Sequence, residues 1–379
     1  MKGAIITKRF VSIITLLVLF FTYVPINAQS NKSVCVLNAT TGEVVYEENG
    51  REKRSMASTT KIMTLLVALE NSRPDDIVTI SKDAAYEEGS SAYLMPDAKI
   101  TMEDVLYGLM LNSGNDAAVA VANHIGNSVE CFAELMNEKA KEIGVLNTQF
   151  KNPNGLEADG HYTTAYDLAV ITKYALNNSD FRKIVSSKIH TGKMNLSDGT
   201  VKEIEYINHN RLLDEIEGCI GVKTGFTKVA GRCLVSAVER DGASYIVVTL
   251  NDPDDWNTHK AMYDMAYETM QKNTTIKKGD CFKHIVSENG SCNLVARDDF
   301  EIYTNHNGGH KVEIIRHIPQ NIDFPLNEGE KVGYAEIIYD GKAIGKVDII
   351  SDSDFKAEGK TKIKNCYMFT FLNLLRNIL

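Results

Sequence analysis

The order of strand-like and helical segments leaves this chain of 379 residues few possible folds. Apolar runs at 34–37 and 44–46 surround a glycine-containing turn and predict an N-terminal β-hairpin. Apolar residues then recur at helical spacing within 58–184, most clearly over 61–70. Strand-like runs follow at 220–226, 232–238 and 244–250. The most economical packing places the hairpin beside these later strands in one antiparallel sheet, covered by helices, with the inserted helices forming a second lobe.

The sequence changes character near residue 275. A helical segment expected over 256–271 ends there, and short strand-like runs separated by Gly and Asn turns continue to about residue 350. This pattern predicts a small all-β domain over 275–360, in which we find no catalytic cluster. The length also suits two domains better than one. We therefore expect an α+β protein, with a mixed domain at 29–274 followed by the all-β domain.

The N-terminus has the pattern of a secretory signal peptide. Lys2, Lys8 and Arg9 precede an apolar run over 10–24, and a small residue, Ala28, stands at the expected cleavage site. The alternative is an uncleaved membrane anchor, but the apolar run is shorter than the roughly 20 residues that span a bilayer. We therefore expect residues 1–28 to be removed and the mature chain to be exported.

The C-terminal segment 361–379 has the pattern of an amphipathic helix. Met368, Phe371, Leu372 and Leu375 would share one face, whereas polar residues gather elsewhere. The segment is too short to cross a bilayer, so we expect it to lie in the outer interface of the cytoplasmic membrane. An ordinary helix packed on the all-β domain is the alternative.

Charge and cysteine content argue against nucleic acid and zinc as partners. The net charge is −9, whereas nucleic-acid binding requires a basic face. The seven cysteines include no CxxC pair, so neither a zinc ribbon nor a dense disulfide framework is expected. One or two disulfides are compatible with the sequence, which leaves their pairing open. We expect no metal and no cofactor.

Ser58 and Lys61 form the first candidate catalytic pair. They stand three residues apart at the expected start of a helix, so both side chains lie on one face. A serine needs a base to become a nucleophile, and a lysine can be that base if burial or nearby positive charge lowers its pKa. The pair is not specific by itself, because Ser353-Asp354-Phe355-Lys356 has the same spacing in a polar turn.

Two further motifs supply groups that such a pair needs. Ser113-Gly114-Asn115 falls in a loop after a helical stretch, where its serine can relay a proton and its amide can hold the lysine. Lys223-Thr224-Gly225 falls in a predicted strand, where Lys223 and Thr224 can bind a substrate carboxylate and the glycine leaves room for an extended substrate. Each also has an ordinary explanation, a helix–helix turn and an edge strand, and Ser291-Cys292-Asn293 fits the SxN pattern as well.

The combination is more specific than its parts. A Ser-Lys pair on an early helix, an SxN loop and a KTG strand in this order are typical of class A β-lactamases and penicillin-binding proteins. The chain resembles one branch of that group, the D-alanyl-D-alanine carboxypeptidases among the low-molecular-mass penicillin-binding proteins (peptidase family S11). The resemblance covers nearly all of the mature chain and is carried by segments 57–64, 111–118, 152–156 and 221–227.

This resemblance implies a fold and an activity. The fold would be a serine β-lactamase/transpeptidase-like α+β domain, followed by the family's β domain and an amphipathic tail that anchors the enzyme to the outer face of the membrane. The activity would be removal of the terminal D-alanine from peptidoglycan stem peptides ending in D-Ala-D-Ala, which regulates wall crosslinking. β-Lactam antibiotics would be covalent inhibitors.

The resemblance also implies residue roles. Ser58 would be the nucleophile, Lys61 its base, and Ser113 would help to return a proton to the departing D-alanine. The substrate would be bound by Asn115, Lys223, Thr224, Gly225 and Phe226. Backbone N–H groups of Ser58 and Phe226 would hold the oxyanion. Phe226 stands where some members have histidine. The family's additional carboxylate-binding arginine has no clear counterpart, and the candidates are Arg211, Arg232 and His259.

Three alternatives are open. A class A β-lactamase needs a deacylating glutamate, but no ExxLN stretch lies between the SxN and KTG motifs, and Glu157 has a different context. A zinc carboxypeptidase needs a ligand cluster such as HExxH; His161 with Asp167 is the best fragment, which we interpret as polar surface. A non-catalytic wall-binding scaffold would not require every one of the motif residues to be intact.

Overall fold

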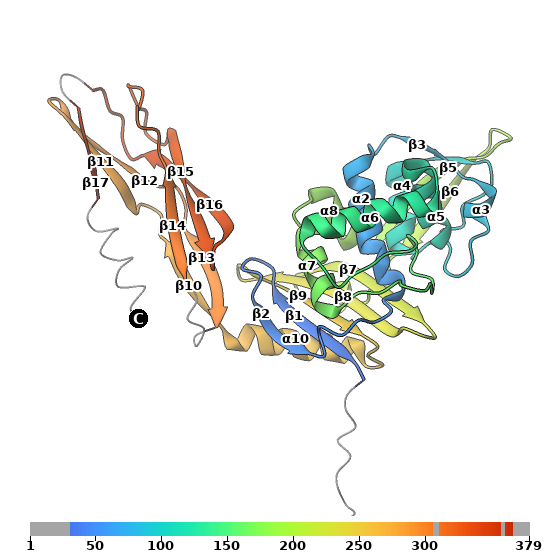
Figure 1. Ribbon diagram of the computed structural model, residues 1–379. Helices are drawn as coiled ribbons and strands as arrows, with labels where there is room; N and C mark the ends of the chain where they lie inside the picture. The colour runs from blue at the N-terminus through green and yellow to red at the C-terminus, as the bar shows by residue number, and fades with distance from the viewer. Residues whose placement is uncertain (1–30, 306–310, 358–360, 367–379) are drawn as a thin grey trace, which may run out of the picture. The chain divides into compact units, whose positions relative to one another are not determined.

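The computed structural model describes residues 31–305, 311–357 and 361–366. A five-stranded antiparallel sheet has the strand order β2-β1-β9-β8-β7 (Figure 1). Its strands are β1 (Ser33–Asn38), β2 (Val44–Glu48), β7 (Cys219–Thr227), β8 (Gly231–Arg240) and β9 (Ala243–Leu250). The pairing confirms that the N-terminal hairpin joins the three later strands in one sheet.

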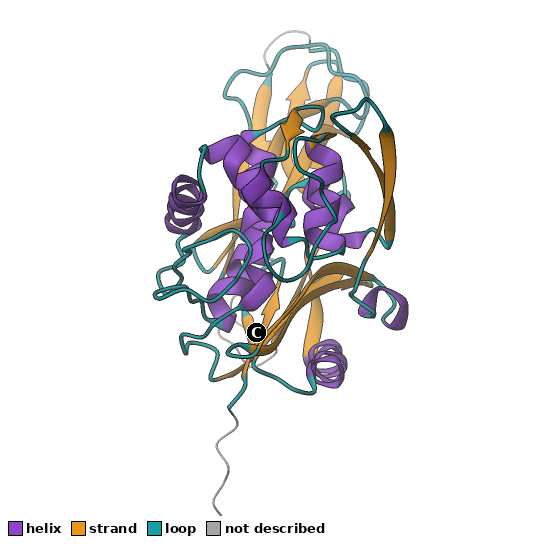
Figure 2. Ribbon diagram, turned by 90° about the vertical axis from the view of Figure 1, so that its right-hand side faces the viewer, coloured by secondary structure: helices purple, strands orange, loops and turns teal. Residues whose placement is uncertain are grey.

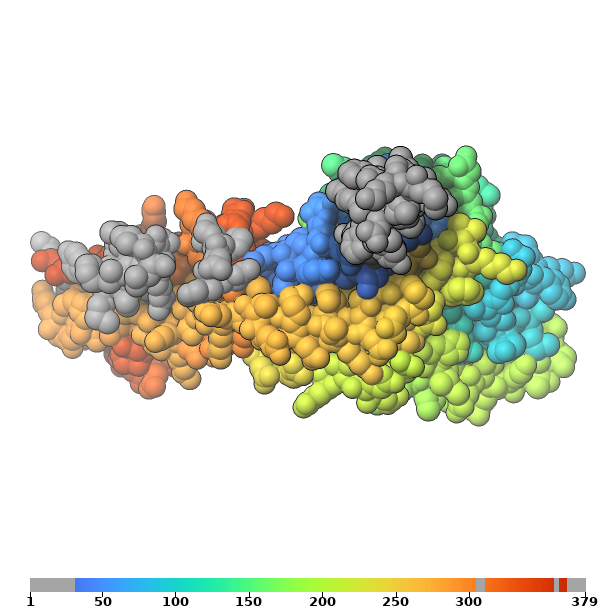
Figure 3. All heavy atoms as spheres, turned by 90° about the horizontal axis from the view of Figure 1, so that it is seen from below, coloured from blue at the N-terminus to red at the C-terminus, as the bar shows by residue number. Residues whose placement is uncertain are grey.

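Both faces of this sheet are covered, which explains why its central strands are apolar almost without interruption. On β1, Cys35 and Leu37 belong to the large core that the sheet shares with the helical lobe. Val36 points the other way and packs in a cluster with Tyr263 of helix α10 (Asp255–Thr269). The far side of α10 lies at the surface (Figure 3). A slip of one residue in β1 would exchange its two buried faces, so the register is strongly specified.

Helix α2 (Lys61–Asn71) is buried on nearly all sides and belongs to the helical lobe, whose helices lie together in Figure 2. It packs against α4 (Met102–Leu111), α5 (Asn115–Gly126), α6 (Val129–Ile143), α7 (Ala165–Ala175) and α8 (Ser179–Ser186). Side-chain caps mark the helix starts: the hydroxyls of Thr101, Ser128 and Thr164 accept backbone N–H groups in the first turns of α4, α6 and α7. The helices expected within 58–184 are confirmed.

A second sheet, in the order β3-β4-β5-β6, packs against α4 and was not expected from the sequence. Its strands are β3 (Ile77–Thr79), β4 (Lys99–Thr101), β5 (Ile189–Asn195) and β6 (Val201–Ile207). β3 and β4 have three residues each, which is too short for a periodic signal. β5 and β6 form a largely exposed hairpin with few buried apolar residues, so their pattern is sparse. The short helices α3 (Lys82–Ala85) and α9 (Leu212–Glu215) complete this part of the chain.

The described strands between Met270 and Asn365 form the all-β region. One sheet has the order β14-β15-β16-β12-β11-β17, and a smaller one pairs β10 with β13. The strands are β10 (Met270–Ile276), β11 (Cys281–Ser287), β12 (Gly290–Ala296), β13 (Phe300–Asn305), β14 (Val312–His317), β15 (Lys331–Tyr339), β16 (Lys342–Ser351) and β17 (Lys362–Asn365). A core cluster of its own includes Phe282, Leu294 and Ile337. The β structure begins at Met270, earlier than expected, because α10 ends at Thr269.

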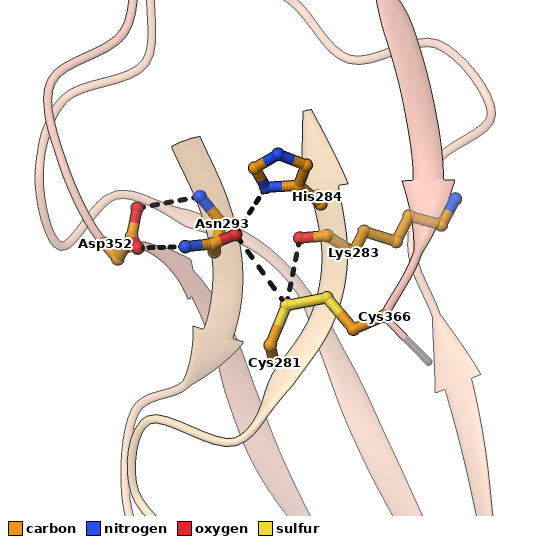
Figure 4. The surroundings of a disulfide bond; sticks show 6 residues. All are labelled: Cys281, Lys283, His284, Asn293, Asp352 and Cys366. Carbon is orange, nitrogen blue, oxygen red and sulfur yellow. Dashed lines mark hydrogen bonds between the residues drawn. A yellow bond between two sulfur atoms is a disulfide. The ribbon is translucent and has the colours of Figure 1, made fainter. Parts of the chain in front are cut away.

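A disulfide between Cys281 and Cys366 ties the last described strand to the first long strand of this sheet (Figure 4). The two Cα atoms are 5.9 Å apart. β17 pairs antiparallel with β11, with Lys364 opposite His284. The sheet therefore extends beyond residue 360, where we expected the membrane tail to begin. The sequence had left the cysteine pairing open.

Two further expectations lie outside the described residues. These are the signal peptide over residues 1–28 and the apolar face of the tail, whose residues fall within 367–379. Among the helices of the described ranges, none is both long enough and apolar enough to span a membrane.

Candidate active site

Ser58 lies in a short 3-10 turn that leads directly into α2. The turn, η1, comprises Ala57–Thr60, and Lys61 is the first residue of the helix. Ala57 has a φ of 47°, in the left-handed region that residues with a Cβ rarely adopt. The hydroxyl of Thr60 donates to the carbonyl of Ala57 at 2.8 Å and so holds this backbone in place. The turn presents Ser58 partly exposed at the start of a buried helix.

Lys61 is completely buried beneath Ser58, and its amine contacts three oxygens. The Nζ atom lies 3.0 Å from Ser58 Oγ, 2.7 Å from Asn115 Oδ1 and 2.6 Å from Asn154 O. Burial lowers the pKa of Lys61 well below its ordinary value, and the nearby Lys223 ammonium lowers it further. Burial and a nearby positive charge are the two conditions under which a lysine can act as the base for a serine.

The SxN motif forms the turn between α4 and α5. Ser113 has a φ of 59° and is 6% exposed. The Asn115 amide is oriented by its two ends, because Nδ2 donates to the carbonyl of Glu88 at 2.6 Å while Oδ1 accepts from Lys61. The hydrogen bonds that hold Lys61 do not include Ser113, which lies two residues before Asn115.

The KTG motif lies on β7, the edge strand next to η1. Lys223 is buried, which lowers its pKa to about 7, and its amine donates to the carbonyl of Thr224. A Cβ on Gly225 would lie 3.1 Å from the backbone nitrogen of Ser58, closer than Cβ atoms ordinarily pack, so glycine lets the strand pass the nucleophile without displacing it. The ring of Phe226 is 65% exposed.

Asn154 is a site residue to which the sequence analysis assigned no role. Its carbonyl accepts from Lys61, and its side-chain oxygen accepts from Leu156 N at 3.0 Å. The adjacent Gly155 has a φ of 91°, and a Cβ there would lie 2.0 Å from the carbonyl oxygen of Ala57. Segment 152–156 carries part of the family resemblance, but its residues alone do not show that it lies under η1.

The interpretation of His161 as polar surface is wrong, because this side chain is buried behind the nucleophile turn. Its Nδ1 accepts from the backbone N–H of Lys151 at 3.0 Å. The other nitrogen, Nε2, must then carry the proton and donate to Thr60 Oγ1 at 2.9 Å. Burial lowers the pKa of His161 to about 4, so the ring is neutral near pH 7. A chain of hydrogen bonds thus runs from Lys151 through His161 and Thr60 to Ala57 O.

The other residues considered as candidates lie in different settings. His259 is buried and hydrogen-bonded to Ser236 and Thr249, so it has a structural role. Arg232 pairs with Asp255 at 2.8 Å, and Arg211 pairs with Glu215. Both guanidinium groups also lie over the ring of Trp256. Both arginines are thus already paired with carboxylates of this chain, and these contacts assign neither of them to the substrate carboxylate.

The second serine–lysine pair and the zinc fragment also have ordinary surroundings. Ser353 follows β16 in the all-β region, where its hydroxyl donates to Asp352. Asp167, the other half of the fragment that we interpreted as polar surface, is buried as well, and its carboxylate accepts from Asn147 N and Thr148 Oγ1. In the part of the chain that the structure describes, no group of three or more His, Cys, Asp or Glu residues is placed to hold a metal ion.

Two family models match the chain. Residues 22–254 match the D-alanyl-D-alanine carboxypeptidase family, peptidase family S11. Residues 269–357 match the C-terminal domain of penicillin-binding protein 5.

Individual proteins are similar over the same regions. The D-alanyl-D-alanine carboxypeptidase DacF of Bacillus subtilis is 32% identical over 345 residues, which cover 88% of this chain and 87% of the relative. The crystal structure of the D-alanyl-D-alanine carboxypeptidase DacD from Francisella tularensis is 25% identical, with a TM-score of 0.60, and covers 86% of this chain and 94% of that one. The Streptomyces K15 DD-transpeptidase is 34% identical, with a TM-score of 0.59, and covers 62% and 94%.

Proposed function

Because the chain belongs to the D-alanyl-D-alanine carboxypeptidase family of serine peptidases, we propose that it removes the terminal D-alanine from peptidoglycan stem peptides ending in D-Ala-D-Ala. The observation that carries the proposal is the contact between the buried amine of Lys61 and the hydroxyl of Ser58. We assign the chemistry to the mixed domain that ends with α10 at Thr269, and we treat the β strands from Met270 onward as a separate domain.

Lys61 acts as the base in this proposal. A neutral lysine amine has two N–H donors and one lone pair. The two carbonyl oxygens, Asn115 Oδ1 and Asn154 O, can take both donors. The lone pair then faces Ser58 Oγ and can accept the hydroxyl proton as Ser58 attacks. The lowered pKa of Lys61 supports this role, because it favours the neutral amine.

The acyl-enzyme forms when Ser58 Oγ attacks the carbonyl of the penultimate D-alanine. The peptide C–N bond breaks, and the departing D-alanine nitrogen receives a proton from Lys61 with the help of Ser113. Backbone N–H groups of Ser58 and Phe226 hold the oxyanion, which is supported by the close approach of Gly225 to the Ser58 nitrogen. Water then hydrolyses the ester.

Substrate binding falls to β7 and to the SxN turn. An extended stem peptide pairs with the edge of β7 across the glycine, and Lys223 with Thr224 binds its terminal carboxylate. The side chain of Asn115 holds the Lys61 amine and also binds the peptide oxygen of the substrate. Glu157 is exposed at this edge and accepts from the hydroxyls of Ser55 and Thr227. Each carboxylate oxygen of Glu157 therefore accepts one hydroxyl of this chain.

The place of action proposed for the enzyme is the outer face of the cytoplasmic membrane. The support is the signal-like N-terminus together with the amphipathic pattern of the last residues. Removal of the terminal D-alanine there limits the crosslinking of the wall. β-Lactams would acylate Ser58 as substrate mimics.

Transpeptidation is a second candidate function. It is favoured by the likeness to the Streptomyces K15 protein, which is described as a DD-transpeptidase. The same acyl-enzyme would then pass to an acceptor amine instead of water.

The test is release of free D-alanine from a stem pentapeptide by the full chain. Ser58→Ala should abolish release, whereas Ser353→Ala, the matched serine of the second SxxK sequence, should release D-alanine at the unchanged rate. Adding an amine acceptor separates the two functions, because a transpeptidase yields a ligated peptide and a carboxypeptidase a free tetrapeptide. Release that survives in Ser58→Ala would overturn the proposal.

A further inference from the structure

The segment of residues 86–94 forms a strap that the SxN turn holds in place. Asn115 Nδ2 and Asn115 N donate to the carbonyls of Glu88 and Ser90 at 2.6 and 2.7 Å. The carboxylate of Asp116, which is completely buried, accepts from Ser91 Oγ and from two backbone N–H groups of the strap. The strap is therefore fixed by the same two residues that begin α5 beside the catalytic lysine.

Glu87, at the start of this strap, directs its carboxylate toward Asn154, one of the residues whose oxygens contact the Lys61 amine. Its Oε1 accepts from Asn154 Nδ2 at 2.9 Å. The carbonyl of the same Asn154 accepts from Lys61 Nζ at 2.6 Å. One residue thus connects a carboxylate to the amine proposed as the base, and this residue, Asn154, is only 3% exposed, so the end of the connection next to Lys61 is shielded from water.

Three charged groups act on Lys61. The ammonium of Lys223 lowers the pKa of Lys61, whereas the carboxylates of Asp116 and Glu87 raise it. Asp116 cannot be neutralised without breaking the hydrogen bonds that fix the strap. Glu87 is partly buried, and its charge can be removed while its hydrogen bond to Asn154 is kept.

We propose that Glu87 is a positioning residue whose carboxylate, acting through Asn154, offsets the charge of Lys223 and so sets the pH range in which Lys61 serves as the base for Ser58. This inference rests on the proposed function, because it concerns the rate of acylation of Ser58.

The sign of the effect follows from the charge. Glu87→Gln removes a negative charge from the neighbourhood of the Lys61 ammonium, so the free amine becomes more abundant at a given acidic pH. Acylation should then be about threefold faster on the acidic side of the pH–rate profile, because the rate there rises in proportion to the fraction of free amine. The maximum rate should not change. Burial raises the pKa of Glu87 itself, so the difference should shrink at the lowest pH, where the wild-type carboxyl is also neutral.

The experiment measures the rate of covalent labelling by a fluorescent penicillin from about pH 4 to 9 for the wild-type chain, Glu87→Gln and Asp97→Asn. Asp97 is an exposed residue just beyond the strap with a φ of 63°, which asparagine also tolerates, so this control removes one charge from the same region. Melting temperatures and labelling at the optimal pH identify any variant that is misfolded.

A profile shifted toward lower pH in Glu87→Gln alone supports the inference. Superimposable profiles for wild type and Glu87→Gln overturn it, as does an equal shift in Asp97→Asn, because the effect would then be general surface charge. A wild-type chain that takes no label at any pH would instead contradict the proposed function. If Glu87→Gln loses rate equally at every pH, Glu87 acts only through the shape of the site, and the inference is also wrong.

Discussion

Gly155→Ala should damage the nucleophile turn far more than the same substitution at a glycine of matched conformation. The added Cβ would lie 2.0 Å from the carbonyl oxygen of Ala57 and 3.0 Å from the nitrogen of Ser58, at a φ of 91°. The left-handed conformation costs an alanine about 1–2 kcal/mol. Displacing the Ala57 carbonyl adds about 1–3 kcal/mol, the usual range for overpacking. The free energy of unfolding should therefore fall by about 2–5 kcal/mol, which most folded domains survive.

Gly199→Ala is the matched control for this prediction. Gly199 has a φ of 85° in the turn between β5 and β6, and a Cβ there would meet nothing within 4 Å. This variant should lose only the conformational cost and should be acylated at the wild-type rate. Gly155→Ala should be acylated at least about tenfold more slowly, equivalent to about 1.4 kcal/mol in the barrier. Denaturant unfolding and rates of penicillin labelling measure both quantities. Equal losses in the two variants would refute the role of Gly155 in positioning the turn.

Three other predictions address separate contacts. His161→Ala leaves Lys151 N and Thr60 Oγ1 without their partner, so stability should fall by about 1–3 kcal/mol and acylation should slow. His161→Gln keeps a donor and an acceptor and should recover part of both losses. Equal labelling rates in the two variants would contradict a role for the hydrogen-bond chain through His161 in acylation. Lys223 loses its proton as pH rises through about 7, so the ratio of labelling rates for a penicillin and its methyl ester should fall across that pH, and a constant ratio would argue against carboxylate binding. Cys366→Ser removes the disulfide to Cys281, which closes a loop with a sequence separation of 85, and should lower the stability of the β region by about 4 kcal/mol. Acylation of Ser58 should be unaffected. An unchanged melting temperature of the β region in calorimetry would contradict this prediction.

The main sheet and the helical lobe could be predicted because their signals are local. Long buried strands such as β8 and β9 and a buried helix such as α2 each require a continuous apolar pattern, which the sequence displays. The spacing of Ser58 and Lys61 on one helical turn likewise needs no tertiary information, and in the structure their side chains are 3.0 Å apart.

The remaining site residues could not be predicted because they meet only through the tertiary fold. Asn154 and Glu87 are 93 and 26 residues away from Lys61 along the chain, respectively, and lie in loops without periodicity. His161 stands in a polar stretch, so its burial follows from the packing of that loop beneath η1 rather than from its neighbours. The disulfide partner of Cys281 was equally hidden, because β17 is short and mostly exposed.

The central claim is that Ser58, served by Lys61, is the nucleophile, and the most direct measurement is the position of a β-lactam adduct. The full chain is incubated with a penicillin, digested, and the modified peptide is sequenced by mass spectrometry. We predict a single adduct on Ser58, absent from Ser58→Ala and retained in Ser353→Ala. An adduct on another residue, or a complete absence of adduct in a folded chain, would contradict the account.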